Sequence, residues 1–308
     1  MKKTSIGGQA LIEGIMMRGP GKMATAVRKT DGEIVTKVED LDVAKRAKIK
    51  KIPLVRGSFV LFEAMISGIK ELMYAASFFE DDDSVKEDAL DRFLKKVFKD
   101  KANDAIIYFS LIISMILSIG IFVIGPSLLT NLLKSVTENS IVLNITEGLI
   151  RVVIFIVYLL LISKLDDIKR VFRYHGAEHK TIHCYEHDEE LTVENVQKYT
   201  TLHPRCGTSF IANVIIISII VFTFFGWPNP LLRVVIRLVM LPVIAGISYE
   251  INRYIGSHDQ NKPLLKILAW PGLQIQKITT AQPFDEMVEV AIVAMKEVIP
   301  DDGSDEIQ

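Results

Sequence analysis

Charged residues are missing from two long stretches of this sequence. Ala105–Leu133 contains none over 29 residues, and Cys206–Trp227 contains none over 22. A helix rises about 1.5 Å per residue, so either stretch is long enough to cross the roughly 30 Å hydrocarbon core of a bilayer. These runs exclude a purely soluble globular domain and predict an integral membrane protein.

Two further apolar stretches contain isolated arginines. Leu149–Ser163 has one, and Leu231–Tyr249 has Arg233 and Arg237. Each arginine stands near the start of its stretch, where a long side chain can extend to the lipid headgroups. The alternative is that the arginine pair of the fourth span faces inward and reaches an anion or a carboxylate such as Glu147.

Lysine and arginine are scarce in two of the connecting loops. The region up to Lys101 has twenty and segment 164–209 has seven, whereas the loop after the first span has only Lys134 and loop 226–230 has none. Because basic residues collect on the cytoplasmic side of a membrane, we predict four spans with both termini in the cytoplasm.

Cysteine is scarce as well. Cys184 and Cys206 are the only two, and both lie on the predicted cytoplasmic side, where thiols stay reduced. The first 21 residues lack the apolar core of a cleavable signal peptide, and the N-terminal glycines are not followed by the Lys-Ser/Thr of a phosphate-binding loop. These absences exclude a disulfide-stabilised secreted domain and a P-loop nucleotide-binding protein.

The segments outside the spans differ in their predicted structure. Residues 1–52 place Gly-Pro-Gly and Asp-Gly turns between short β-forming runs, which predicts a β-rich cytoplasmic N-terminal region. Residues 53–101 predict amphipathic interfacial helices joined by an acidic linker, although Pro53–Phe79 is long enough to form a fifth span. In the C-terminal region, Pro271-Gly272 predicts a chain break, and a helix is expected between Pro283 and Pro300.

The predicted fold class is therefore mainly α: a polytopic membrane protein with about four transmembrane helices, amphipathic interfacial helices and a small β-rich N-terminal region. Its transmembrane domain is expected at 102–250, with a cytoplasmic histidine-rich segment at 164–209 inside it. Residues 251–308 are expected to form a cytoplasmic C-terminal region.

Four of the six histidines fall within 13 residues, in the stretch FRYHGAEHKTIHCYEH, and are spaced four apart: His175, His179, His183 and His187. At 100° per residue, the first three of them share one helix face with Glu186 and continue the apolar stripe of the preceding turns. Cys184 lies on the opposite side of the helix, where we expect it to pack. His187 is expected at the surface.

The order His175-Gly-Ala-Glu178-His179 predicts a metal site. Two histidines at i and i+4 can offer two imidazole nitrogens to one ion, and H-x-x-E-H is the order found in inverzincins. In such sites the glutamate acts on a water molecule whose pKa the ion lowers towards neutrality. Further ligands are expected from His203 and Cys206, just before the third span, and from Glu250 at the cytoplasmic end of the fourth. An ordinary polar stripe on an interfacial helix is the alternative.

Six motifs run nearly end to end along the chain: GGQALIEGIMMRGP, VRG, YHGAEHKTIHCYE, HPRCGTSF, YEINR and PGLQIQKITTAQP. In these motifs the sequence resembles the YqhQ-like family of bacterial membrane proteins, which is commonly described as a family of predicted metal-dependent enzymes. The resemblance implies a bacterial plasma-membrane location, and it does not establish a reaction.

Carried onto this sequence, the family motifs add polar residues that would support the metal ligands. They are His183, Glu186, Arg205, Gln274 and Gln276, together with Gln9, Glu13 and Arg18 of the N-terminal motif. The type of these motifs implies that the side chains dock on the same cytoplasmic face.

Two functions compete. The first is a hydrolase of a peptide or lipid-linked compound that depends on a divalent metal, zinc in the simplest case, with Glu178 as the catalytic base. The second is a non-enzymatic partner in the assembly or biogenesis of another membrane protein, with a structural metal site. A transporter is disfavoured because the spans contain few acidic residues and no inverted repeat. The lipid bilayer is an expected partner, and no nucleic acid is expected.

Overall fold

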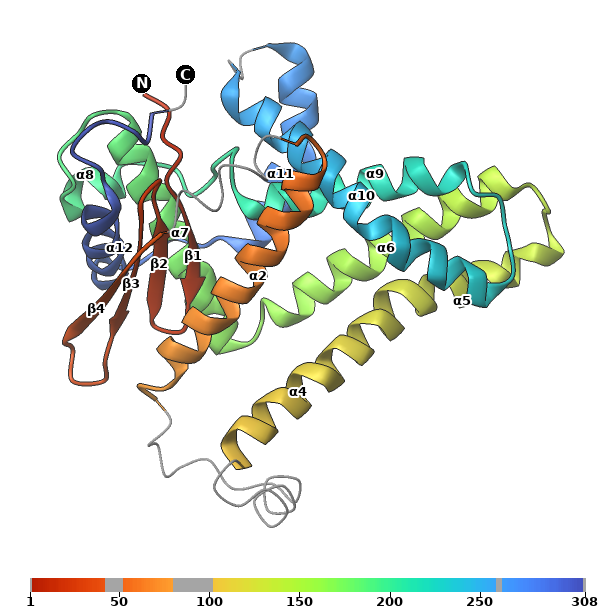
Figure 1. The fold of residues 1–308 in the computed structure, drawn as a ribbon, viewed down its shortest axis with the longest axis horizontal. Helices are drawn as coiled ribbons and strands as arrows, with labels where there is room; N and C mark the ends of the chain where they lie inside the picture. The colour runs from red at the N-terminus through yellow and green to blue at the C-terminus, as the bar shows by residue number, and fades with distance from the viewer. Residues whose placement is uncertain (1, 42–51, 80–101, 259–261, 307–308) are drawn as a thin grey trace. The chain divides into compact units, whose positions relative to one another are not determined.

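The computed structural model describes residues 2–41, 52–79, 102–258 and 262–306 (Figure 1). The acidic linker and the second amphipathic helix expected within 80–101 lie outside the described residues. The chain divides into two compact units. The first comprises Met1–Phe79, Ile156–Ser218 and Val239–Gln308, and the second comprises Glu80–Phe155 and Ile219–Leu238.

The N-terminal region is a four-stranded antiparallel meander in the order β1-β2-β3-β4. Its strands are β1 (Gly7–Leu11), β2 (Gly14–Arg18), β3 (Lys22–Arg28) and β4 (Ile34–Asp40). Both predicted turns are present: Gly19-Pro20-Gly21 joins β2 to β3, and Asp31-Gly32 joins β3 to β4 with Gly32 at a φ of +89°. The sheet confirms the β-rich N-terminal region expected from the sequence.

Both faces of this sheet are buried against helices. Successive side chains of a strand point to opposite faces, so Ala24 and Ala26 of β3 pack in the core formed with α7 (Asp166–Glu186) and α12 (Asp285–Val298). Met23 and Val27 of the same strand belong to a second cluster. That cluster also contains Ala75, near the end of α2 (Val55–Ala76).

Among the described residues, four helices are long and apolar enough to cross a membrane: Phe109–Ser135, Ser140–Ile162, Gly207–Phe225 and Pro230–Ser257. The first contains the part of α4 (Ala102–Ile119) from Phe109 onwards, followed by η2 (Gly120–Ile124), α5 (Gly125–Asn131) and η3 (Leu132–Ser135). The others are α6 (Ser140–Ile162), α9 (Gly207–Thr223) and α10 (Pro230–Ser257). The four predicted spans are confirmed by length and composition.

Three further helices belong to the first unit. Helix α2 is not among the candidate spans, and it exposes large apolar side chains such as Phe62 and Ile66, as expected of an amphipathic helix. Helix α8 covers Val193–Gln197. Helix α11 (Pro263–Thr279) continues through Pro271-Gly272, where the sequence predicts a break. Gly272 lies so close to Ser209 that a Cβ there would come within 2.6 Å of the serine Cβ, so the glycine serves helix packing instead of ending the helix.

Helix α12 matches its prediction and provides a test of the core. Met295 on α12 is fully buried in the core shared with the sheet and α7. We expect Met295→Ala to lower the free energy of unfolding by about 2–5 kcal/mol, because it leaves a cavity in a packed core. The neighbouring variant Lys296→Ala, at an exposed position, should change it little. Thermal unfolding in detergent measures both, and equal effects would contradict the described packing.

Candidate metal centre

One side of helix α7 packs in an apolar core, and its histidines lie on another side, which is also buried. Tyr174, Ala177 and Cys184 pack in the core with the sheet and α12. Cys184 is fully buried there, as expected, and burial raises the pKa of its thiol to about 11. A thiol that stays protonated in an apolar core is a packing group and a poor metal ligand.

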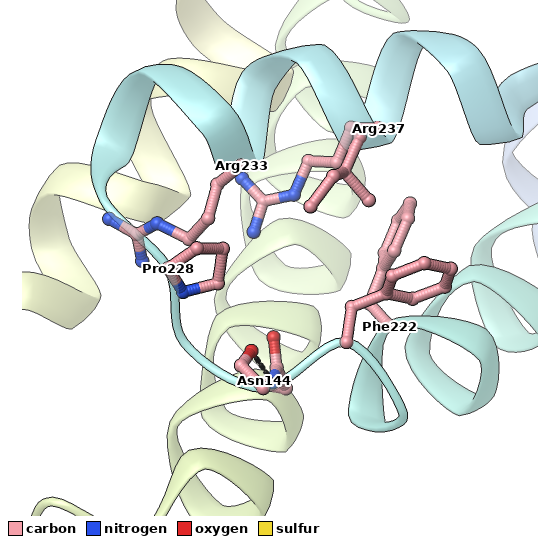
Figure 2. A pocket seen from close by; sticks show the side chains of 8 residues that line it. Asn144, Phe222, Pro228, Arg233 and Arg237 are labelled. Carbon is pink, nitrogen blue, oxygen red and sulfur yellow. Dashed lines mark hydrogen bonds between the residues drawn. The ribbon is translucent and has the colours of Figure 1, made fainter.

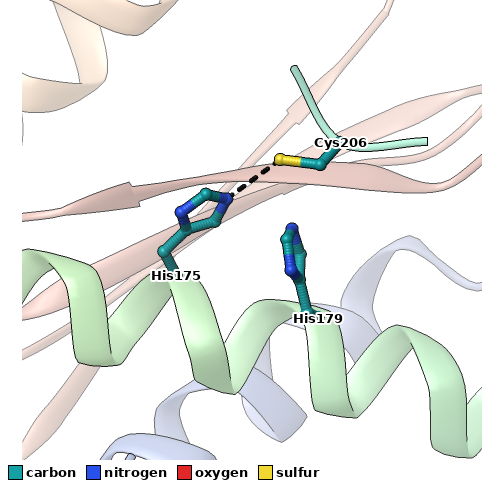
Figure 3. A group of neighbouring side chains, drawn as sticks. All are labelled: His175, His179 and Cys206. Carbon is teal, nitrogen blue, oxygen red and sulfur yellow. Dashed lines mark hydrogen bonds between the residues drawn. The ribbon is translucent and has the colours of Figure 1, made fainter. Parts of the chain in front are cut away.

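His175, His179 and Cys206 form the first of two clusters that could hold a metal ion (Figure 3). Their ligand atoms all lie within 4.8 Å of one another. The Nε2 atom of His175 is 3.1 Å from Sγ of Cys206, which belongs to the segment just before α9. One turn of α7 separates the two histidines, so the sequence spacing brings both rings to the same thiol.

Main-chain carbonyl groups set the orientation of both rings. Nδ1 of His175 donates to the carbonyl oxygen of Thr279 at 2.8 Å, and Nδ1 of His179 donates to that of Thr201 at 2.5 Å. A proton on Nδ1 leaves the lone pair on Nε2, the arrangement usual in metal-binding histidines. Nε2 of His179 is buried and has no hydrogen-bond partner among the described residues. Two imidazoles and a thiol are the donor types that zinc takes, so these residues fit such an ion.

The thiol of Cys206 is prepared for the ionised form. Burial by itself would raise its pKa, but hydrogen bonds with Thr208 act in the opposite direction, and the pKa lies below the usual value. The Thr208 hydroxyl lies 3.2 Å from Sγ, and the Thr208 main-chain N–H donates to Sγ at 3.4 Å. The thiolate is the form that binds metals.

Glu178 lies beside this cluster. Its Oε1 accepts a hydrogen bond from the main-chain N–H of Gly8 in β1, at 3.0 Å. A Cβ at position 8 would come within 3.0 Å of Cδ of Glu178 and 2.7 Å of the Met16 carbonyl oxygen, so the close approach requires glycine. Burial raises the pKa of Glu178 to about 7, against the opposing effect of His175. A carboxyl group with a pKa near neutrality can take up and release a proton.

His183, Glu186 and His203 form the second cluster, and their ligand atoms also lie within 4.8 Å of one another. Nδ1 of His203 accepts from the main-chain N–H of Arg205, so Nε2 carries the proton and donates to Oε2 of Glu186 at 3.3 Å. The Arg205 guanidinium pairs with Oε1 of Glu186, which also accepts from the N–H of Thr4. The carboxylate is therefore neutralised and hydrogen-bonded by protein groups alone.

Gln276 holds the loop that carries His203 and Cys206. Its Oε1 accepts from the N–H of His203 and its Nε2 donates to the carbonyl of His203, both at 2.8 Å. The Cys206 N–H in turn donates to that same carbonyl oxygen at 3.3 Å. Gln276 is fully buried, so this family residue supports the cluster through main-chain contacts.

The remaining predicted residues lie away from both clusters. The carboxylate of Glu250 pairs with Arg56 at the start of α2, and Glu250 belongs to neither cluster. The others have local partners: Glu13 pairs with Arg170, Arg18 with Glu63, Gln274 accepts from Lys277, and Gln9 lies against Gly68. Sequence reasoning missed the carbonyls of Thr201 and Thr279, because a main-chain acceptor leaves no signal in residue type.

The buried histidines make stability depend on pH. Burial lowers the pKa of His203 to about 4, below the usual value near 6.5. Protonation then favours the unfolded chain, so stability that is present above pH 6.5 is lost as the pH falls towards 4. As the pH falls over this range, metal-free wild-type protein should lose more thermal stability than metal-free His203→Gln. A matched His258→Gln variant, outside both clusters, should keep the wild-type pH profile, and a profile unchanged by His203→Gln would contradict the burial.

Comparison with known proteins agrees with the sequence motifs. Residues 52–301 match the family model described as "Protein of unknown function (DUF1385)". Over 298 residues the chain is 36% identical to "Uncharacterized protein YqhQ" of Bacillus subtilis (strain 168). The matched region covers 95% of this chain and 92% of that protein. No solved structure matches the chain. With four helices suited to a bilayer and these matches, the chain belongs to the DUF1385 family of proteins of unknown function.

Proposed function

We propose that this membrane protein is a zinc-dependent hydrolase, with His175, His179 and Cys206 as the ligands and Glu178 as the proton acceptor. The observation that supports it most is the buried Nε2 atom of His179. This nitrogen has no hydrogen-bond partner among the described residues, although burying an unpaired polar group is costly. It lies in one cluster with the Cys206 thiol and Nε2 of His175, and an ion between the three would pair it.

Each side chain has a separate task in this proposal. Three protein ligands leave a fourth position open, which is typical of catalytic zinc sites and not of structural ones. When bound, zinc polarises a water molecule or a substrate carbonyl. Glu178 takes the proton of the attacking water and passes it to the leaving group, while the Gly8 N–H holds its Oε1 in place.

In this proposal the second cluster holds in place the loop that carries Cys206, a ligand in the first cluster. Its ion pair between Glu186 and Arg205 and its hydrogen bond between Glu186 and His203 lie next to the loop that carries Cys206. In this proposal His203 is a positioning residue and the metal has three protein ligands, not four. Gln276 belongs to the same support through the main chain of His203.

The charge distribution supports a location for the protein, and the place of the site in the chain supports a class of substrate. Basic residues crowd the first hundred positions and segment 164–209, so we place the protein in a bacterial plasma membrane with both termini and the site on the cytoplasmic side. A site in the segment that joins two spans suits a substrate presented at the membrane, a peptide or a lipid-linked compound.

A second candidate is a non-enzymatic partner of another membrane protein, with the metal in a structural role. The apolar face of α2 favours it: Phe62, Met65 and Ile66 are all more than half exposed. Such a face suits a lipid surface or a protein partner equally. The two candidates differ in what Glu178 does, since only the hydrolase needs its proton chemistry.

Metal content tests the proposed ligands. Purified wild-type protein reloaded with zinc should hold about one ion per chain. His179→Ala and Cys206→Ala should lose it, because each removes one of three ligands, whereas His187→Ala, at an exposed position of the same histidine row, should retain it. Elemental analysis measures the content. Folded wild-type protein without zinc, or equal zinc in all variants, would contradict the site.

Glu178→Gln separates the two candidate functions. The amide keeps the size of the side chain and removes its basicity, so zinc content and thermal stability should stay at wild-type values. Hydrolysis should fall by about 10²–10⁴-fold, measured on those members of a peptide and lipid-linked substrate panel that the wild type cleaves. Glu189→Gln, at an exposed position, is the control. Full function in Glu178→Gln would contradict the hydrolase proposal and support the partner role.

A further inference from the structure

Three arginines surround one carboxylate in the second compact unit. Arg233 and Arg237 come from α10, and Arg151 and Glu147 come from α6. The side chains of Arg233 and Arg237 are only 4% and 7% exposed, and that of Glu147 is 2% exposed. The arginines of the fourth span therefore face inward and reach Glu147, instead of extending to the headgroups by themselves.

The cluster has more positive charge than its carboxylate can neutralise. Glu147 pairs with Arg237, with Nη2 of Arg151 at 3.1 Å and with Nη1 of Arg233 at 3.9 Å. Three guanidinium groups against one carboxylate leave an excess of two positive charges among these four side chains. Buried charges in a membrane protein need a partner, so the cluster calls for a further anion.

Three nitrogen donors of this cluster lack a hydrogen bond within the described part of the chain. Nε and Nη1 of Arg233 and Nη1 of Arg237 are buried and have no hydrogen-bond partner among the described residues. The rest of Arg233 is held in place: Nη2 donates to Oδ1 of Asn131 at 3.0 Å, and the guanidinium lies 3.9 Å from the ring centre of Trp227. The guanidinium of Arg233 is thus held in place, while its Nε–H and Nη1–H, which lie on different edges of the group, have no hydrogen bond to any described residue.

These two arginines line a small pocket with Asn144, Phe222 and Pro228 (Figure 2). The pocket is partly open and has room for about one water-sized group, which suits one oxygen of an anion whose other atoms stay outside. The amide of Asn144 is already bonded to the carbonyls of Ser140 and Gly226. Arginine donors and apolar walls therefore define the chemistry of the pocket.

The cluster lies near the ends of its helices. Arg233 is the fourth residue of α10 and Glu147 the eighth of α6, so at 1.5 Å per residue they are roughly 5–10 Å from the helix starts. Interfacial helices enter the boundary between headgroups and acyl chains by a similar length, so a headgroup phosphate can reach arginines this close to a helix start.

We propose that this pocket takes up one phosphate oxygen of an anionic phospholipid headgroup. A phosphate oxygen accepts hydrogen bonds from guanidinium N–H groups, and one negative charge reduces the excess in the cluster. A phosphatidylcholine headgroup would bring a cation towards that excess, so anionic lipid is preferred. This site is independent of the proposed zinc centre.

Native mass spectrometry of the delipidated full-length protein in detergent tests the site. Phosphatidylglycerol should bind one per chain and raise the thermal midpoint of the wild type, while phosphatidylcholine should do neither. Arg233→Gln should weaken phosphatidylglycerol binding about tenfold or more. Lys134→Gln removes an exposed charge of the same unit and should bind as the wild type does. Arg233→Lys, which keeps the charge and has a single donor nitrogen, should lie between them.

Other outcomes would overturn the proposal. Equal binding and equal stabilisation by the two lipids in the wild type would contradict it without the use of any variant, even if Arg233→Gln failed to fold. Phosphatidylglycerol binding unaffected in folded Arg233→Gln would place the lipid elsewhere. Binding of inorganic phosphate that phosphatidylglycerol cannot displace would assign the pocket to free phosphate and reject the lipid.

Discussion

Helix α7 is buried on more than one side, and the candidate metal centre depends on how that burial is achieved. One side packs through Tyr174, Ala177 and Cys184 into the core with the sheet and α12. His175 and His179 extend from the same helix towards the loop that carries Cys206. The sheet approaches so closely that the Gly8 N–H reaches Glu178. Packing of an apolar core thereby places the ligand atoms of His175, His179 and Cys206 within 4.8 Å of one another, with Glu178 beside them.

Removal from water then decides the protonation states in this region. Burial lowers the pKa of His179 to about 4 and raises that of Glu178 to about 7, so desolvation favours the uncharged form of both groups. A neutral imidazole is the form that binds metals. The charges that are retained nearby are paired, as Glu186 is with Arg205. In the arginine cluster of the second unit, by contrast, pairing is incomplete, which is why it points to a ligand.

Local patterns in the sequence predict much of the fold and half of the site. Uncharged runs predict the spans, turn residues predict the sheet, and the four-residue spacing predicts that His175 and His179 act together while Cys184 packs. The remaining features depend on contacts between distant segments. Glu250 is a plausible ligand by position, yet Arg56, 194 residues away, takes its carboxylate. His203 is engaged by Glu186, and Pro271 is carried inside α11 because Gly272 packs against Ser209. Residue types alone do not encode such pairings, nor the main-chain carbonyls that orient the histidine rings.

The central claim is that two histidines of one helix turn and one cysteine of a distant loop share an ion. X-ray absorption at the zinc edge of the zinc-loaded protein measures this most directly, because sulfur and nitrogen ligands differ in distance. We expect one sulfur at about 2.3 Å and two imidazole nitrogens at about 2.0–2.1 Å. A zinc shell without sulfur would contradict the claim, since it would place the ion away from Cys206.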